Sequence, residues 1–329
     1  MRLFDCTLRD GANVVGNGFS AELTENVING LFSCGIYDIE LGNAKGIGAY
    51  DKGAIAPLSD EEYMHLVAPY AKQGRLGMFQ QANLAEENTI KKAADYGLSF
   101  LRVGLNAGNG KDAIGAIKMV KNAGLTCRYS LMKAYVLTPE ELASEARMLQ
   151  DAGVDMITIM DSAGTMYPED VSTYVQALKN NLEIPVGFHG HSNLGLSQAN
   201  ALAAAAANVD EIDCGLLGMA RSAGNCSTEV AAATLEKAGY STGADLYKLL
   251  GYLDKKLIPA MKEYDYHVAI TPLDLVLGLS GCHSNYMPMF TEVAEKEHVD
   301  LFRLIIDVSA IDRKAPSKEL LYQVAKQLK

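Results

Sequence analysis

Two histidines separated by one glycine, His189 and His191, follow a short apolar run at 184–188. On a β-strand, side chains two residues apart point to the same face. Two imidazoles on one face at the end of a strand can bind one metal ion together. The pair therefore predicts a metal site at the point where this strand ends.

A carboxylate from early in the chain completes the predicted site. Arg9 and Asp10 follow the first β-like run, and Gly11 permits a tight turn directly after them. If both strands belong to one parallel barrel, Asp10 and the two histidines converge at one mouth. This donor set leaves coordination positions open for an oxygen-bearing substrate, and it favours Mn²⁺ or Mg²⁺, with Co²⁺ and Zn²⁺ as alternatives. Asn225, after the last predicted strand, is a candidate for a further oxygen ligand.

Other polar side chains follow neighbouring predicted strands. Glu40 lies between two apolar residues, where a buried acid is costly unless it is paired, and Arg9 is the expected partner that Glu40 would hold in place. Ser162 offers a hydroxyl, with backbone N–H groups nearby, that suits a carboxylate. Lys133 leaves Schiff-base chemistry with a keto substrate as an alternative to the metal.

The elements that must position these residues recur along the first part of the chain. Apolar, β-like runs alternate with amphipathic helical stretches, as repeated βα units require. Four of the helical stretches end in a glycine directly before the next strand, at 35, 97, 124 and 153. About eight such units close a (β/α)8 TIM barrel, in the α/β class. The predicted strands are 2–6, 37–41, 75–80, 100–104, 125–131, 155–160, 184–189 and 211–215.

The region after residue 240 has a different pattern, with helical stretches expected at 246–261, 289–297 and 318–329. We therefore expect two domains. Residues 1–240 would form the catalytic TIM barrel. Residues 241–329 would form a helical C-terminal extension, packed on the barrel or against a partner subunit.

The composition narrows the class of protein. The net charge of −11 and the isoelectric point near 5.1 argue against nucleic acid or an anionic membrane as a partner. The six cysteines are scattered without a CxxC pair, which favours a reduced, cytoplasmic protein. The sequence shows no signal-peptide pattern and no apolar run long enough to span a bilayer.

Five short segments resemble, in order, the motifs of the DRE-type metal-dependent lyase and aldolase superfamily of TIM barrels: TLRDG (7–11), IEL (39–41), DSAG (161–164), GFHGHSNLG (187–195) and SAGN (222–225). The closest likeness is to the 4-hydroxy-2-oxovalerate aldolases. The resemblance implies a lyase that forms or cleaves a C–C bond through a pyruvate enolate. Such an enzyme converts a 4-hydroxy-2-oxoacid into pyruvate and an aldehyde.

The resemblance also implies roles for single residues. The metal would bind Asp10, His189 and His191 and chelate the small 2-oxoacid. Arg9 would stabilise the developing enolate, a charge-stabilising role that contributes strongly to catalysis. Ser162 would bind the substrate carboxylate, so that substrate contacts come from Arg9, Asp10, Ser162 and His189.

The chain departs from the family at the acid/base residue. The aldolases carry a histidine two residues after the Asp-Gly step of the first motif, and Asn13 stands there in this chain. An amide cannot exchange a proton at neutral pH. We therefore expect the acid/base role to move to His283, in SGCHSNY (280–286), with Tyr286 and Lys133 as alternatives.

Two other functions stay open at this point. One is an acyl-CoA-dependent condensing synthase or lyase of the same superfamily, similar to isopropylmalate synthase or hydroxymethylglutaryl-CoA lyase. The other is a catalytically altered barrel that serves as a partner subunit, which Asn13 keeps open. Because aldolases of the family often pass an aldehyde to a dehydrogenase, the resemblance also implies an aldehyde dehydrogenase partner. The tail helices could equally form a homo-oligomer.

Overall fold

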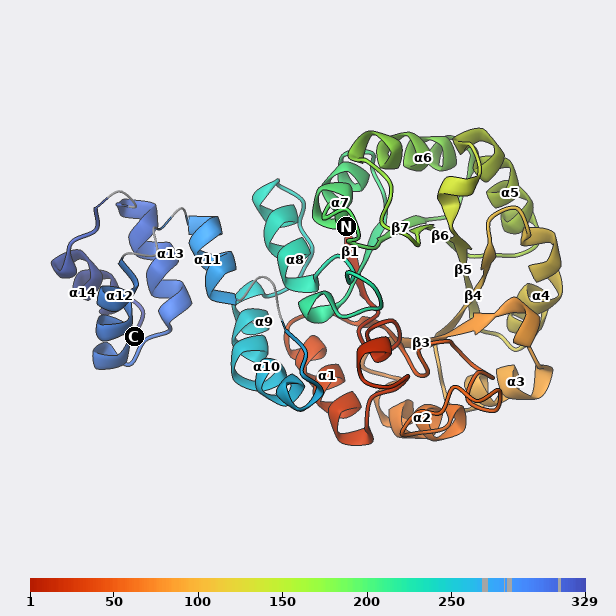
Figure 1. The fold of residues 1–329 in the computed structure, drawn as a ribbon, viewed down its shortest axis with the longest axis horizontal. Helices are drawn as coiled ribbons and strands as arrows, with labels where there is room; N and C mark the ends of the chain where they lie inside the picture. Colours follow the sequence, from red (N-terminus) through yellow and green to blue (C-terminus); the bar gives the residue numbers. More distant parts are fainter. Residues whose placement is uncertain (268–271, 281, 283–285, 313–314) are drawn as a thin grey trace. The chain divides into compact units, whose positions relative to one another are not determined.

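The computed structural model describes residues 1–267, 272–280, 282, 286–312 and 315–329 (Figure 1). These residues divide into two compact units, Met1–Asp245 and Leu246–Lys329. The predicted acid/base residue, His283, lies outside the described residues.

The first unit is a closed barrel of parallel strands in sequence order, β1 to β8. Each strand pairs with the next, and β1 pairs with β8 to close the sheet. Each predicted strand segment overlaps a strand of the structure, which confirms the predicted TIM barrel. The strands are β1 (Arg2–Asp5), β2 (Asp38–Leu41), β3 (Arg75–Gln81), β4 (Phe100–Asn106), β5 (Thr126–Met132), β6 (Met156–Asp161), β7 (Val186–Gly190) and β8 (Glu211–Cys214).

Helices α1 to α8 alternate with the strands and surround them as an outer ring (Figure 1). Their buried faces cover the sheet, as in other barrels of this class. The helices are α1 (Ala21–Ser33), α2 (Asp60–Val67), α3 (Glu87–Asp95), α4 (Ile114–Asn122), α5 (Pro139–Asp151), α6 (Pro168–Asn181), α7 (Ser197–Ala206) and α8 (Thr228–Lys237).

Local signals in the sequence set where these helices begin and end. The Thr138 hydroxyl accepts a hydrogen bond from the backbone N–H of Glu141, and the Glu141 carboxylate accepts one from the backbone N–H of Thr138. This capping box begins α5, with Pro139 at the first helical position. The four glycines predicted to end helices all have positive φ, between 80° and 108°, a conformation that glycine adopts without strain.

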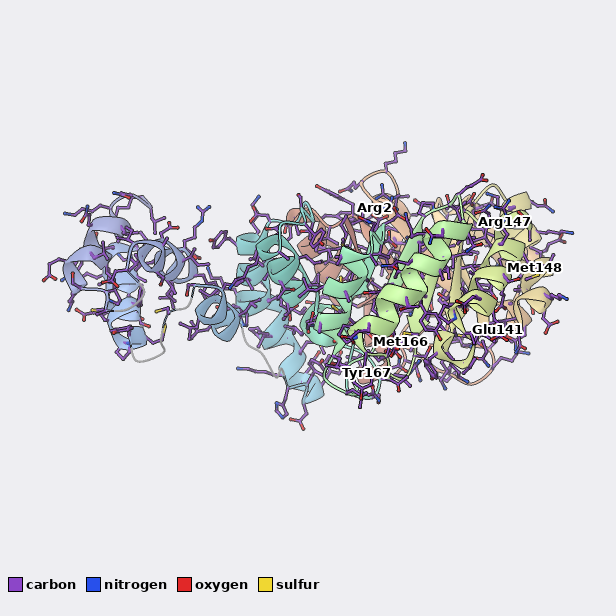
Figure 2. All side chains as sticks on the ribbon, turned by 90° about the horizontal axis from the view of Figure 1, so that it is seen from above. Arg2, Glu141, Arg147, Met148, Met166 and Tyr167 are labelled. Atoms are coloured by element: carbon purple, nitrogen blue, oxygen red, sulfur yellow. The ribbon has the colours of Figure 1, made fainter. Side chains whose placement is uncertain are left out.

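The strands begin at one end of the barrel, and the loops that follow them lie at the other. Arg2, at the start of β1, lies at one end, and Tyr167, in the loop after β6, lies at the other (Figure 2). The loops that follow the strands gather at the second end, where enzymes with this fold place their active sites.

The inside of the barrel is filled by side chains in layers. The rings of Phe4 and Phe100 lie with their centroids 5.6 Å apart. The guanidinium groups of Arg102 and Arg128 lie 4.7 Å and 4.1 Å from the centroid of the Phe4 ring. Both arginines are buried. Aromatic rings therefore pack against two arginines inside the barrel, and each arginine needs carboxylate partners.

The second unit is helical. A π-helical segment, Leu253–Leu257, joins α9 to α10. Neither α11 nor α13 was expected from the sequence. No helix in the described part of the chain is both long and apolar enough to cross a membrane. The helices of this unit are α9 (Leu246–Tyr252), α10 (Ile258–Met261), α11 (Pro272–Ser280), α12 (Met287–Glu297), α13 (Leu301–Ile311) and α14 (Lys318–Ala325).

Candidate metal centre

The barrel brings three predicted ligands together where strands end. Asp10 follows β1, His189 lies in β7, and His191 comes directly after β7. The Nε2 atoms of His189 and His191 lie 3.6 Å and 3.7 Å from Oδ2 of Asp10. All three side chains are buried. The structure therefore brings these three residues together, and their role as metal ligands stays a prediction.

A fourth side chain, Cys6, lies in the same group and was not anticipated. Among the described residues, Cys6, Asp10 and His189 form the one set of three whose ligand atoms all lie within 4.8 Å of one another. Nε2 of His189 is buried without a hydrogen-bond partner among the described residues. Buried polar atoms normally have partners, so this nitrogen fits a site that takes a cation.

The second ring nitrogen of each histidine has its own partner. Nδ1 of His189 lies 3.2 Å from Oδ2 of Asp213, and Nδ1 of His191 lies 3.3 Å from the carbonyl oxygen of Gly224. Because both partners are acceptors, each Nδ1 carries the hydrogen and donates it. The lone pair of each Nε2 then faces Asp10, as a metal-binding histidine requires.

Arg9 lies beside this group, held as the sequence predicts. Its Nε donates to Oε2 of Glu40 over 2.6 Å, and its Nη1 lies 3.0 Å from Oδ1 of Asp10. The guanidinium group also lies 5.2 Å from the centre of the Phe79 ring. The predicted pair of Arg9 and Glu40 is confirmed. Glu40 contacts two arginines here, so it positions Arg9 rather than touching a substrate.

The second of these arginines, Arg102, connects the site across the barrel. Its Nε and Nη2 donate to the two carboxylate oxygens of Glu40 over 2.7 Å and 2.6 Å, and its Nη1 donates to Asp213. Sequence reasoning missed both Arg102 and Asp213. The available signal was a charged residue between two apolar ones in each predicted strand, Arg102 in FLRVGLN (100–106) and Asp213 in EIDC (211–214).

The charges of the network reinforce one another. Three carboxylates, on Asp10, Glu40 and Asp213, face two guanidinium groups, on Arg9 and Arg102, which leaves one net negative charge before the imidazoles are counted. Burial alone raises the pKa of Asp10, but Arg9 and the two imidazoles outweigh it and hold the pKa well below its usual range. Such a site attracts a divalent cation.

Burial and neighbouring charges also set the pKa values of the residues around Asp10. Burial raises the pKa of Asp213, but Arg102 and the imidazole of His189 outweigh it and bring it to about 2. Burial and the neighbouring His189 lower the pKa of His191 to about 3, although Asp10 opposes the shift. The carboxylate therefore stays ionised and this imidazole stays neutral at neutral pH, the protonation states that metal ligation needs.

Two asparagines contact Asp10. Nδ2 of Asn225 donates to Oδ2 of Asp10 over 3.0 Å, so a half-turn of the amide would present its oxygen to a cation bound there. Asn13 donates from Nδ2 to the backbone oxygen of Asp10 over 2.8 Å and to its Oδ1 over 3.3 Å. Asn13 therefore holds Asp10 in place, in the position where the resemblance would put a proton-transferring histidine.

Not every predicted site residue joins the group. Ser162 follows β6, and its hydroxyl accepts a hydrogen bond from the backbone N–H of Lys133 over 2.9 Å. None of the contacts described for Ser162 reaches the Asp10–histidine group. Lys133 is exposed and adopts a left-handed conformation with φ of 55°. Tyr286 precedes α12 in the second unit.

Gly164 fits tightly against the histidine strand. Its φ is +59°, and a Cβ added there would lie 2.5 Å from the carbonyl oxygen of His191 and 2.6 Å from the backbone nitrogen of Asn193. Any side chain at position 164 would therefore push the backbone that carries His191.

A family model and individual relatives both match this chain over most of its length. A family model described as HMGL-like matches residues 1–254. A protein named 4-hydroxy-2-oxovalerate aldolase from Carboxydothermus hydrogenoformans is 32% identical, covering 100% of this chain and 97% of the relative. A protein of the same name from Moorella thermoacetica is 31% identical and covers 100% and 96%.

Solved structures share the fold at lower identity. HMG-CoA lyase from Brucella melitensis has a TM-score of 0.65 and 18% identity, covering 80% of this chain and 98% of that protein. The carboxyl transferase domain of Rhizobium etli pyruvate carboxylase has a TM-score of 0.70 and 17% identity, covering 100% of this chain and 61% of that one. At these identities the likeness is one of fold alone.

Proposed function

Because the chain belongs to the HMGL-like family, we propose that it is a divalent-metal-dependent aldolase that cleaves a 4-hydroxy-2-oxoacid into pyruvate and an aldehyde. The observation that carries this proposal is the convergence of Asp10, His189 and His191 at one barrel mouth, with Arg9 beside them. Full-length relatives named 4-hydroxy-2-oxovalerate aldolase support the choice of substrate class.

The residues present fit a divalent metal. Asp10, His189 and His191 would hold it, and Asn225 would add an amide oxygen after a half-turn of its side chain. When bound, a divalent metal supplies a Lewis acid that polarises the keto oxygen of a 2-oxoacid and lowers the barrier to its enolate. The nitrogen and oxygen donors by themselves favour Mn²⁺ or Mg²⁺, with Co²⁺ and Zn²⁺ as alternatives.

Arg9 is placed to stabilise negative charge on the substrate. Its Nε and Nη1 contact Glu40 and Asp10, whereas its Nη2 is buried and finds no hydrogen-bond partner among the residues that the structure describes. A buried, rigid donor of this kind is most effective where charge develops during the reaction. Arg9 would therefore donate to the keto oxygen as the enolate forms.

The remaining roles follow from the sequence and stay predictions. The Ser162 hydroxyl accepts one hydrogen bond and keeps its own hydrogen for a substrate carboxylate. Asn13 cannot move the proton of the 4-hydroxyl group, so we assign that step to His283. An aldehyde dehydrogenase partner, a homo-oligomer and a cytoplasmic location belong to the same set of predictions.

The test is pyruvate release from 4-hydroxy-2-oxovalerate by the purified protein. We expect activity with added Mn²⁺, loss of activity with a chelator, and recovery when metal is restored. Asp10→Asn is the matched variant, because it keeps the shape of the side chain and removes the charged ligand. Activity that survives the chelator would contradict the proposal.

Two further measurements separate the alternatives. Release of free thiol from acetyl-CoA with a panel of 2-oxoacids would identify an acyl-CoA-dependent synthase or lyase instead. Tight metal binding without turnover of any 2-oxoacid would identify a catalytically altered barrel. His283→Ala should lower pyruvate release while leaving metal affinity unchanged, since the role assigned to His283 is proton transfer.

A further inference from the structure

Cys6 lies beside the predicted metal ligands, inside the barrel. It follows β1 directly and packs in a buried cluster with Phe4 and Phe100. Its Sγ lies within 4.8 Å of a carboxylate oxygen of Asp10 and a ring nitrogen of His189. The thiol is fully buried. A sulfur atom therefore faces the same space as the predicted carboxylate and imidazole donors.

The thiol has only weak hydrogen-bond partners in this position. Sγ donates to the carbonyl oxygen of Cys214 over 3.1 Å and accepts from Nδ2 of Asn225 over 3.5 Å. The same Nδ2 donates to Oδ2 of Asp10, so Cys6 and Asp10 share one amide. Nε2 of His189 meanwhile has no hydrogen-bond partner in the described part of the chain. A cation bound among these atoms would meet sulfur as well as nitrogen and oxygen.

We infer that Cys6 Sγ is a further ligand of the metal, on the inner side of the barrel. This inference rests on the proposed function, since it concerns the same metal. On coordination, a metal–sulfur bond forms, the S–H bond breaks, and the proton leaves to solvent. A thiolate donor favours Zn²⁺ and Co²⁺ over Mg²⁺ and Mn²⁺, because hard cations prefer oxygen ligands. Cys6 therefore sets the metal preference of this site.

The other cysteines nearby do not share this position. Sγ of Cys226 donates to the side-chain oxygen of Gln198 over 3.0 Å, and Sγ of Cys214 donates to the carbonyl oxygen of Phe4 over 3.5 Å. Neither belongs to the group of ligand atoms around Asp10. Cys127 is also buried, and its charged neighbours are Asp155 and Lys121. Cys127→Ser is thus a matched control that removes a buried thiol elsewhere.

Co²⁺ gives a direct readout, because a thiolate bound to Co²⁺ produces a sulfur-to-metal charge-transfer band in the near ultraviolet. We expect this band in the unaltered protein loaded with one equivalent of Co²⁺. It should persist in Cys127→Ser and disappear in Cys6→Ser, while the weaker visible bands of bound Co²⁺ remain. The spectrum of the unaltered protein is informative by itself, even where Cys6→Ser folds poorly.

Affinity provides a second readout. The Kd for Zn²⁺, measured by competition with a chromophoric chelator, should rise roughly tenfold to a hundredfold in Cys6→Ser. The Kd for Mg²⁺ should stay nearly unchanged, because oxygen suits Mg²⁺ as well as sulfur does or better. Equal changes for both metals would overturn the inference.

The outcomes separate this inference from the proposed function. Visible bands without a charge-transfer band would show Co²⁺ bound by nitrogen and oxygen alone, which overturns the role of Cys6 and leaves the proposed aldolase intact. No bound Co²⁺ at all would overturn both. A charge-transfer band in a protein that does not release pyruvate would support the ligand and contradict the aldolase.

Discussion

Two groups of buried carboxylates in the barrel have pKa values shifted in opposite directions. Glu40 and Asp213 lie inside the barrel against Arg102, and the pKa of each is lowered although burial raises it. Asp5 ends β1 and Glu229 lies in the first turn of α8, and hydroxyl and backbone groups are their described partners. Burial raises the pKa of Asp5 to about 6 and that of Glu229 to about 7.

Burial is nearly the same in the two groups, so the arginines account for the difference. All four carboxylates are at most 2% exposed. Hydrogen bonds from Thr7 and Thr228 only partly offset the desolvation of Asp5, whereas guanidinium groups more than offset that of Glu40 and Asp213. The interior arginines therefore keep the candidate metal centre ionised. Asp5 and Glu229, which no arginine faces, instead titrate close to neutral pH, and Glu229 accepts a hydrogen bond from the backbone N–H of Leu217 in the loop after β8.

The largest expected effect comes from removing the shared arginine. Arg102→Met keeps most of the volume but leaves Glu40 and Asp213 each with one partner fewer. Breaking a buried ion pair in this way costs about 3–5 kcal/mol of unfolding free energy, measured by urea denaturation. Lys92→Met is the control, because the pair of Lys92 with Glu61 is exposed on both sides and its loss should change the free energy of unfolding little. Equal losses in both variants would contradict the comparison.

The next largest effect is expected from a substitution at Arg9. Arg9→Lys keeps the positive charge but loses the planar group that contacts Glu40 and Asp10 at once. We expect kcat for pyruvate release to fall about 10²–10³-fold, as when one charge-stabilising donor is removed. The Kd for Mn²⁺ should change little. A variant with full kcat would show that Arg9 only balances charge.

A substitution at Asp213 tests whether the ion pairs of Arg102 affect metal binding. Asp213→Asn keeps the shape of the side chain but removes the charge beside Nδ1 of His189. We expect the affinity for Mn²⁺, measured by titration calorimetry, to fall about 10–100-fold. Asp155→Asn serves as the control, since Asp155 pairs with Lys121 at a partly exposed site. An unchanged Kd in Asp213→Asn would mean that His189 needs no second partner.

A change at Glu229 tests the group without an arginine, and its expected effect is the smallest. Its pKa is about 7 in the folded chain against an ordinary value of 4.5, so folding favours the protonated form. The stability from this group is complete below about pH 4.5 and is lost as the pH rises through about 7.

Glu229→Gln should therefore flatten the dependence of unfolding free energy on pH over this interval. The unaltered protein should lose about 1–2 kcal/mol relative to the variant between pH 5 and 7. Glu183→Gln, at a side chain that is 83% exposed, is the control and should leave the slope unchanged. Parallel curves for Glu229→Gln and the unaltered protein would show that Glu229 ionises freely in the folded chain.

The sequence predicts the barrel well because each βα unit repeats the same local signals. A glycine before a strand marks the end of a helix, and a capping box such as the one at Thr138 marks the start of a helix, wherever in the chain they occur. The histidine pair was predictable because the side-chain period of a strand is two residues. Arg9 and Glu40 were predictable because a buried acid needs a partner.

The remaining site residues depend on the closure of the barrel. Arg102 joins β2 to β8 through Glu40 and Asp213, which are far apart in sequence, and no local pattern shows that they face one another. Cys6 resembles the other scattered cysteines until closure of the barrel brings the end of β1 near the end of β7, with β8 between them. Helix α13 was missed because its apolar residues follow no cap that sequence analysis singled out, although Asp300 accepts a hydrogen bond from the backbone N–H of Arg303.

Gly164 limits how this protein could be redesigned. Loops that follow barrel strands are the natural targets for changing substrate range. Libraries that vary the loop after β6 would be free to change exposed positions, whereas a substitution at 164 would displace the backbone of His191. Selection for new aldehydes should therefore retain glycine there while its neighbours diversify.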